Sequence, residues 1–383
     1  MGEALVGQDP ICNPATMLDG LSFGWRTAVL TVALVQLLLL ALALARTLAN
    51  RTANRTLALL LLVLALQVTP WLIGFAGFYD KWPWLSFAPF QIGLAVAPLA
   101  WLYVVALTEG HWPVHGWRHL LPALVQFGYL GACFALPLAT KLAWANRSAT
   151  GYGLITGLAL LVQLAWYGRA AARRFTGYRL ALGQHIADDQ RFAARWLSVA
   201  LGVLTLLFAI WSGYLLWDLV APLSYKGLMG LYLAIAACAL FLGIEGWRHA
   251  AMPFPRLPSL TTEPAPDQRD WTEQGQAWAA QVRAAGWARD PDLTLASLAR
   301  RLGTNTGYLS RAINQGLGVN FASFVAGLRA EAVAERLRAS DPADLLEIAL
   351  AEGFGSKASF NRAFVARFGQ SPSAFRREVS KPE

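Results

Sequence analysis

Residues 344–368 read DLLEIALAEGFGSKASFNRAFVARF, which is the pattern of two short helices joined by a tight turn. Asp344 can cap the first helix, and with Glu347 three residues later it resembles a capping box. Gly353 can end this helix in a left-handed turn. Ser356 can cap a second helix, whose inward-facing residues are expected to be Phe360, Phe364 and Phe368. The stretch therefore predicts a helix–turn–helix.

A second copy of this design lies upstream. Thr294 is a candidate cap, Gly303 permits a tight turn, and Thr304 can cap the helix that follows. The apolar residues of this copy recur at helical spacing: Leu295, Leu298, Ala299, Leu302, Leu309 and Ile313. Between the copies, residues 321–339 predict one long helix. The two helix–turn–helix elements are expected at about 294–313 and 344–366.

The rest of the chain has a different composition. Of its 383 residues, 56% are hydrophobic and 14% are charged, whereas soluble domains have about 45–50% and about 25%. Residues 1–250 carry 16 Lys and Arg with 9 Asp and Glu, and residues 251–383 carry 16 and 14. This composition excludes a disordered chain and a wholly soluble one. It predicts a membrane-embedded first part followed by a water-soluble domain.

Seven apolar stretches have the length of about 20 residues that a helix needs to cross a bilayer. They lie at about 27–45, 57–76, 88–107, 119–138, 150–168, 196–216 and 227–244. Helices are favoured over strands because the runs lack alternation and because a helix satisfies its own backbone in lipid. We therefore expect an all-α protein with a seven-helix transmembrane domain.

The loops between these stretches predict an orientation. Loops on the C-terminal side carry 11 Lys and Arg, and those on the other side carry 5, so the N-terminus should face outward. Polar residues inside the stretches are few: Gln36, Gln67, Gln91, Gln126 and Gln163. Interhelical hydrogen bonding is the simpler interpretation of these glutamines, and ligand contact is the alternative. Gly153 and Gly157 favour close helix packing.

The boundary between the two parts is rich in proline. Residues 252–267 contain five prolines and no helical period, which is typical of a semi-rigid spacer. We therefore expect three segments. These are a transmembrane sensory domain at 1–249, a Pro-rich linker at 250–270 and a DNA-binding domain at 271–383.

About 85 residues, 293–377, resemble the DNA-binding domain of the AraC/XylS family of helix-turn-helix transcriptional regulators. The strongest likeness is LEIALAEGFGSKASFNRAFVARFGQSPSAFRR at 346–377, with its Ile-Ala, Gly-Phe, Phe-x-Arg-x-Phe and closing Phe-Gly-x-Ser-Pro. Upstream, Tyr308-Leu-Ser-Arg and Ile313-Asn resemble the matching first half. The apolar part resembles a membrane-embedded subgroup of the family with a seven-span N-terminal domain.

The resemblance implies that the second helix of each helix–turn–helix enters a major groove, with about 34 Å between the two grooves. The base-reading positions it implies are Thr306, Gly307, Ser310, Arg311, Lys357, Ala358, Asn361 and Arg362. Arg311 and Arg362 have the geometry to bind guanine, and Asn361 to bind adenine, whereas Gly307 and Ala358 offer no hydrogen-bonding side chain. Phosphate contacts are expected from Arg367, Arg376 and Arg377.

These observations favour a membrane-anchored, sequence-specific transcriptional regulator. It would be a multi-pass protein of the bacterial inner membrane with its DNA-binding domain in the cytoplasm. Its expected partners are promoter DNA, the lipid bilayer, an unknown small-molecule or envelope signal, and a second copy of the chain.

The alternative is a transporter or membrane enzyme with a regulatory helix-turn-helix tail. No chain of paired charges crosses the apolar stretches, which argues against ion-coupled transport. His111, His115 and His119 share four-residue spacing, but Pro113 favours a loop there. The spacing of the three cysteines fits no metal motif. We predict no catalytic residue, no metal site and no cofactor.

Overall fold

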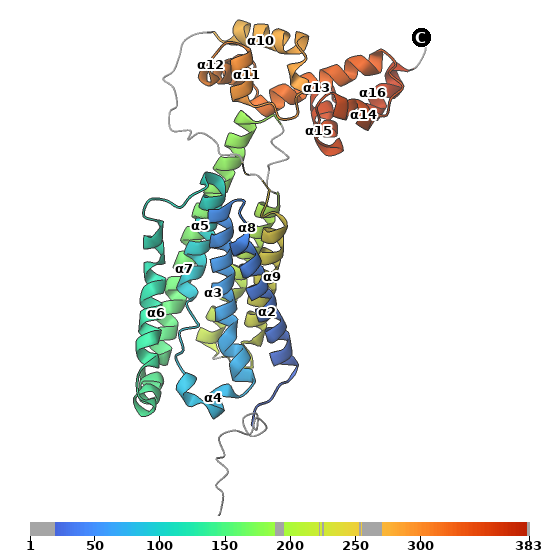
Figure 1. Ribbon diagram of the computed structural model, residues 1–383. Coiled ribbons are helices and arrows are strands. Elements are labelled where there is room, and N and C mark those ends of the chain that lie inside the picture. The colour runs from blue at the N-terminus through green and yellow to red at the C-terminus, as the bar shows by residue number, and fades with distance from the viewer. Residues whose placement is uncertain are drawn as a thin grey trace, which may run out of the picture. The chain divides into compact units, whose positions relative to one another are not determined.

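The computed structural model describes residues 20–187, 195–221, 223, 226–252, 254 and 270–380. Within them the chain forms helices and one isolated β-bridge (Figure 1). It divides into two compact units. The apolar unit contains Met1–Ala172 and Ser198–Pro253, and the C-terminal unit contains Arg173–Leu197 and Phe254–Glu383. The expected Pro-rich linker falls mostly outside the described residues.

The apolar unit is a bundle in which α3 lies between α2, α5 and α9 (Figure 1). The elements whose helices lie wholly or partly in this unit are α2 (Trp25–Arg46), α3 (Arg51–Phe75), α4 (Phe78–Lys81), η1 (Pro83–Leu85), η2 (Gly93–Ala95), α5 (Val96–Glu109), η3 (Gly116–Leu120), α6 (Leu121–Phe134), α7 (Leu138–His185), α8 (Arg195–Val220) and α9 (Met229–Arg248). The faces between α2, α3 and α9 are aliphatic: Leu30, Leu37, Leu61 and Leu64 are fully buried there.

Five helices in the described residues are long and apolar enough to cross a membrane, so the expected count of seven is not reproduced. They lie in α2, α3, α7, α8 and α9. Helices also form in the other two expected stretches, but α5 and α6 have 14 residues each, or about 21 Å, against about 30 Å of hydrocarbon.

Local backbone chemistry explains why these two helices are short. In the stretch 88–107, helical structure begins only at Gly93, after a non-helical segment in which Phe87 has φ 65°. In the stretch 119–138, α6 ends at Phe134, shortly before Pro137, whose ring cannot continue a helix. An apolar run therefore overstated the length of the helix at both places.

Helix α7 is longer than expected. A span was expected at 150–168, yet one helix of 48 residues, about 72 Å, runs through it. Its last part, from Arg173, belongs to the C-terminal unit. The arginines assigned to a loop after this span, Arg169, Arg173, Arg174 and Arg179, are therefore helical.

The two larger hydrophobic cores of the C-terminal unit share one helix, and a smaller cluster is formed by Tyr178, Leu182 and Ile186. The further elements of this unit are α10 (Thr272–Ala284), η4 (Trp287–Arg289), α11 (Leu295–Arg301), α12 (Thr306–Arg311), the π-helix η5 (Ala312–Gly316), α13 (Phe321–Arg338), α14 (Leu345–Ala351), α15 (Lys357–Phe368) and α16 (Pro372–Val379). The first half of α13 supplies Phe321, Phe324, Val325 and Leu328 to one core, and its second half supplies Ala330, Val333, Ala334 and Leu337 to the other.

The segment after α7 also contributes to the first of these cores. Ile186 forms the isolated antiparallel bridge with Thr294, and the Ala187 N–H donates to the Leu293 carbonyl at 3.1 Å. Ala187 is buried among the residues of the first core. Sequence analysis had placed this segment in the membrane part.

Candidate DNA-binding surface

The first helix–turn–helix consists of α11 and α12. Thr294 and Ser297 form a reciprocal capping box at the start of α11, with the Ser297 N–H donating to Thr294 Oγ1 at 3.1 Å. Gly303, at φ +66°, makes the turn. The cap of α12 is Asn305, whose side-chain oxygen accepts from the Tyr308 N–H at 2.8 Å. The sequence had suggested Thr304, one residue earlier.

The second helix–turn–helix consists of α14 and α15. Asp344 caps α14 by accepting from the Leu346 N–H at 3.0 Å, and Ser356 caps α15 by accepting from the Ser359 N–H at 3.2 Å. Gly353, at φ +93°, makes the turn, and a Cβ there would lie 2.5 Å from the Arg289 carbonyl oxygen. Only glycine fits this position, because the backbone is left-handed and another backbone is in contact.

An aromatic cluster fills the second core. Phe354, Phe360, Phe364 and Phe375 are buried. Phe364 meets Phe360 and Phe375 edge-to-face, with ring centroids 5.7 and 5.3 Å apart. This geometry is favourable for aromatic rings. The expected inward phenylalanines therefore form the core of the fold, and their rings are not available for stacking on bases.

Two charged residues that sequence analysis did not single out join the halves of the C-terminal unit. Arg329 is 2% exposed, and its guanidinium donates to the carbonyl oxygens of Ala288 and Asp290 at 2.7 Å each. Glu352 is also 2% exposed, and its carboxylate pairs with Arg289 at 2.8 Å. The Arg329 hydrogen bonds join α13 to η4 and the residue after it. The Arg289–Glu352 ion pair joins η4 to the end of α14. The sequence indicates the burial of Arg329 only through its position four residues after Val325, on the same face of α13.

The eight positions expected to read bases differ in exposure between the two copies. All four on α15 are exposed to solvent, namely Lys357, Ala358, Asn361 and Arg362. On α12, Thr306 and Gly307 are exposed, whereas Ser310 and Arg311 are half-buried. Ser310 Oγ also accepts a hydrogen bond from Asn314 Nδ2 at 3.1 Å.

The three arginines expected at phosphates have different surroundings. Arg367 pairs with Glu331 at 2.7 Å, and Arg283 pairs with the same carboxylate at 2.6 Å. Arg376 is half-buried and donates to the Ala343 carbonyl at 2.6 Å, which ties α16 to the turn before α14. Arg377 is exposed and has no ion pair among the described residues. Lys381, another basic residue of this end, lies outside the described residues.

An ion pair between Arg336 and Asp341 stabilises the turn after α13. The pKa of Asp341 is lowered, first because its carboxylate accepts from the Ala343 N–H and next because of Arg336. The Arg336 guanidinium lies 2.6 Å from the Asp341 carboxylate, and its own pKa is raised by that partner. Both groups are committed to the fold, so they are poor candidates for binding DNA.

Two of the histidines that share four-residue spacing contact other groups of the apolar unit. His119 Nδ1 lies 2.8 Å from the Tyr167 hydroxyl, and His111 Nδ1 lies 2.9 Å from the Trp112 carbonyl oxygen. Among the described residues, no group of three or more His, Cys, Asp and Glu side chains could hold a metal ion.

A comparison with known protein families identifies the class of the C-terminal domain. Residues 298–378, from within α11 to within α16, match the family model of a helix-turn-helix domain of the AraC type. The match covers about a fifth of the chain. No curated protein and no solved structure matches the chain. The C-terminal unit therefore carries the DNA-binding domain of a transcription regulator.

Proposed function

We propose that this protein is a membrane-anchored, sequence-specific transcriptional regulator of the bacterial inner membrane whose apolar unit senses a small-molecule or envelope signal. One observation carries the proposal. The same chain holds five apolar helices long enough to cross a bilayer and a segment that matches a DNA-binding helix-turn-helix domain.

Contacts inside the apolar unit support a cytoplasmic location for the chain that follows α9. Asn50, in the turn between α2 and α3, donates to the Met252 carbonyl at 2.7 Å, and Asn54 donates to the Ala250 carbonyl at 3.0 Å. The end of α9 therefore lies beside the α2–α3 turn. The arginines at this end of the bundle are Arg46, Arg51, Arg55 and Arg248. Such a cluster faces the cytoplasm by the positive-inside rule.

The orientation does not depend on whether five or seven helices cross. Both numbers are odd, so the start of the first span and the end of the last span lie on opposite sides of the bilayer. The short helices α5 and α6 follow one another, and counting both or neither leaves this parity unchanged.

In this proposal α15 is the main reading helix. Asn361 and Arg362 are both exposed, and these side chains can form bidentate hydrogen bonds with adenine and guanine respectively. Residues 354–383 carry six Lys and Arg against two Glu, so attraction to phosphates should concentrate here. Arg377 is the best placed of the three expected phosphate contacts, because Arg367 and Arg376 already have partners within the protein.

The test is genome-wide DNA occupancy of the intact protein in cells, compared with two variants at one position. Arg362→Ala removes both the charge and the bidentate group, and Arg362→Lys keeps the charge alone. We expect both variants to lose specific sites, with Arg362→Lys retaining more non-specific binding. If both occupancy profiles match that of the unaltered protein, Arg362 does not read bases and the assignment is wrong.

Membrane anchoring has a separate test. A reporter enzyme that is active only outside the cytoplasm is fused after His249. We expect it to be inactive there, and activity would reverse the proposed orientation.

A further inference from the structure

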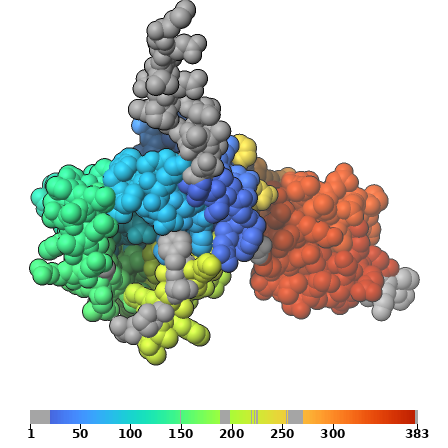
Figure 2. Space-filling view, turned by 90° about the horizontal axis from the view of Figure 1, so that it is seen from below, coloured from blue at the N-terminus to red at the C-terminus, as the bar shows by residue number. Residues whose placement is uncertain are grey.

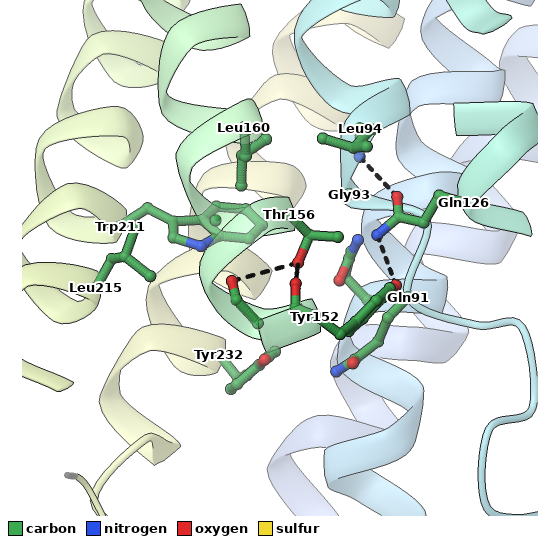
Figure 3. A pocket seen from close by; sticks show the side chains of 13 residues that line it. Gln91, Gly93, Leu94, Gln126, Tyr152, Thr156, Leu160, Trp211, Leu215 and Tyr232 are labelled. Carbon is green, nitrogen blue, oxygen red and sulfur yellow. Dashed lines mark hydrogen bonds between the residues drawn. The ribbon is translucent and has the colours of Figure 1, made fainter. Parts of the chain in front are cut away.

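Three of the five glutamines in the apolar stretches meet at one cavity, although they are far apart in the sequence. Gln67 comes from α3. Gln91 comes from the segment before η2, and Gln126 comes from α6 (Figure 3). The cavity has a volume of about 170 Å³, and its aromatic walls include Tyr152, Trp211 and Tyr232. Gln36 and Gln163 do not line it.

The polar groups of this cavity are partly fixed by the protein itself. Gln126 Oε1 accepts from the Leu94 N–H at 3.1 Å, and Gln126 Nε2 donates to the Tyr152 hydroxyl at 3.1 Å (Figure 3). Both ends of this amide are therefore engaged. Because the Tyr152 hydroxyl accepts in this bond, its own proton remains free to be donated to another group.

Gln67 differs from Gln126. The residue is 3% exposed, and its amide makes no hydrogen bond among the described residues. A Cβ at Gly93 would lie 2.9 Å from Gln67 Nε2, so the glycine leaves room for the amide. The Gln67 amide is not among the sealed polar atoms of the core, so it borders the cavity and can form hydrogen bonds with a polar group that enters there.

The cavity also limits what can enter. Its lining contains no Asp, Glu, Lys, Arg or His, so a charged ligand would find no opposite charge there. A protein cavity of about 150 Å³ is known to hold benzene, which sets the scale of the ligand. Figure 2 shows the end of this unit hollowed between the cyan, green and yellow-green segments that supply the lining.

We propose that this cavity binds a small uncharged molecule, about the size of one aromatic ring, that carries an amide or carbonyl group. The ring lies against Tyr152, Trp211 and Tyr232. The polar group accepts from Tyr152 and exchanges hydrogen bonds with the Gln67 amide. Describing the ligand as a signal rests on the proposed function, but binding itself does not require DNA.

The test measures binding to the full-length protein in lipid nanodiscs without DNA, so it is independent of the occupancy experiment. The probes are benzamide, which is uncharged, and benzoate and benzylamine, which have similar size and opposite charges at pH 7. Saturation-transfer NMR detects each probe on the protein. We expect benzamide to bind, and the two charged probes to bind at least about tenfold more weakly.

Two pairs of variants locate the binding. Gly153 and Gly168 both lie on α7, and a Cβ at either would have no atom within 4 Å, but only Gly153 lines the cavity. We expect Gly153→Leu to abolish benzamide binding and Gly168→Leu to preserve it. Likewise, Gln67→Leu should weaken binding and Gln163→Leu should not.

Three results would overturn the proposal: absent benzamide binding, equal binding of all three probes, or equal binding to Gly153→Leu and Gly168→Leu. The last result would mean that benzamide partitions into lipid or occupies another place. Loss of DNA occupancy in the Arg362 variants would be unaffected by any of these outcomes, so the two proposals can fail separately.

Discussion

The two helix–turn–helix copies differ in how they are built and in what they expose. The second has an aromatic core of its own and a 12-residue helix, α15, on which all four reading positions are exposed. The first has a six-residue helix, α12, that continues as a π-helix, and two of its four positions are half-buried. Its core is completed by Ala187, from a distant part of the chain.

This difference suggests a division of roles. Under the proposed function, the second copy presents an exposed, basic surface to DNA, whereas the first depends on contacts with residues outside the helix–turn–helix itself. The following predictions test that division, beginning with the largest expected effect.

Removing the central aromatic ring should affect the second copy most. Phe364→Ala should destabilise it by about 3–5 kcal/mol, because removing a fully buried ring that contacts three others leaves a cavity. Hydrogen exchange of the full-length protein should show lost protection in α14, α15 and α16, with less change in α11. Equal loss of protection in both copies would mean that they unfold together. It would contradict the proposed difference in how the two copies are stabilised.

The buried guanidinium of α13 should matter to both copies. Arg329→Met removes two charge-assisted hydrogen bonds and leaves two carbonyls without this donor, at a cost of about 3 kcal/mol. The matched control is Arg338→Met on the same helix, where an exposed guanidinium lies 5.3 Å from the Phe375 ring. The control should cost less than about 1 kcal/mol. Thermal unfolding of the two variants gives the comparison, and similar losses would contradict it.

The reading positions should differ in the affinity they contribute. Arg362→Lys should weaken binding to a specific site by about 1–3 kcal/mol, which is the range for a bidentate contact with a base. Arg311→Lys should have the smaller effect, because Arg311 is half-buried before any DNA is bound. Electrophoretic mobility shifts with the best occupied site measure both. A larger effect at Arg311 would make the first copy the principal reader.

The smallest effect concerns pH. The lowered pKa of Asp341 means that its carboxylate stabilises the folded state above its unfolded pKa of about 3.9, and that this stabilisation is lost as the pH falls through the folded value. Asp341→Asn should therefore lower the unfolding temperature more at pH 7 than at pH 3. If the variant and the unaltered protein differ in unfolding temperature by the same amount at pH 7 and pH 3, the ionised Asp341 carboxylate is not the cause.

Sequence patterns were most informative where a local interaction determines the structure. Caps and turns depend on neighbouring residues, so Thr294, Gly303, Asp344, Gly353 and Ser356 were placed before the structure was known. The one cap that was displaced, Asn305 in place of Thr304, has an adjacent residue with equally suitable chemistry. Phe360 and Phe364 were expected inward because the spacing of a helix places them on one face.

Patterns were less informative where distant segments meet. Ala187 joins a core more than 100 positions away along the chain, and no local signal marks it. The convergence of Gln67, Gln91 and Gln126 also depends on how helices pack, although the sequence identified each residue as unusual in an apolar run. Hydropathy gave the positions of the apolar helices but not their lengths, since proline and non-helical backbone shorten α5 and α6.

The shared helix α13 has a geometric consequence for any operator. The buried residues of α13 that pack in the first core end at Leu328, and those that pack in the second begin at Ala330, so the rotation between the two copies is set by the turns of a single helix. Inserting one alanine at this junction would rotate one attachment by about 100° and advance it by about 1.5 Å. Under the proposed function, substitutions at the exposed positions would change which bases are bound, whereas the distance between the two bound sites would change only with the length of α13.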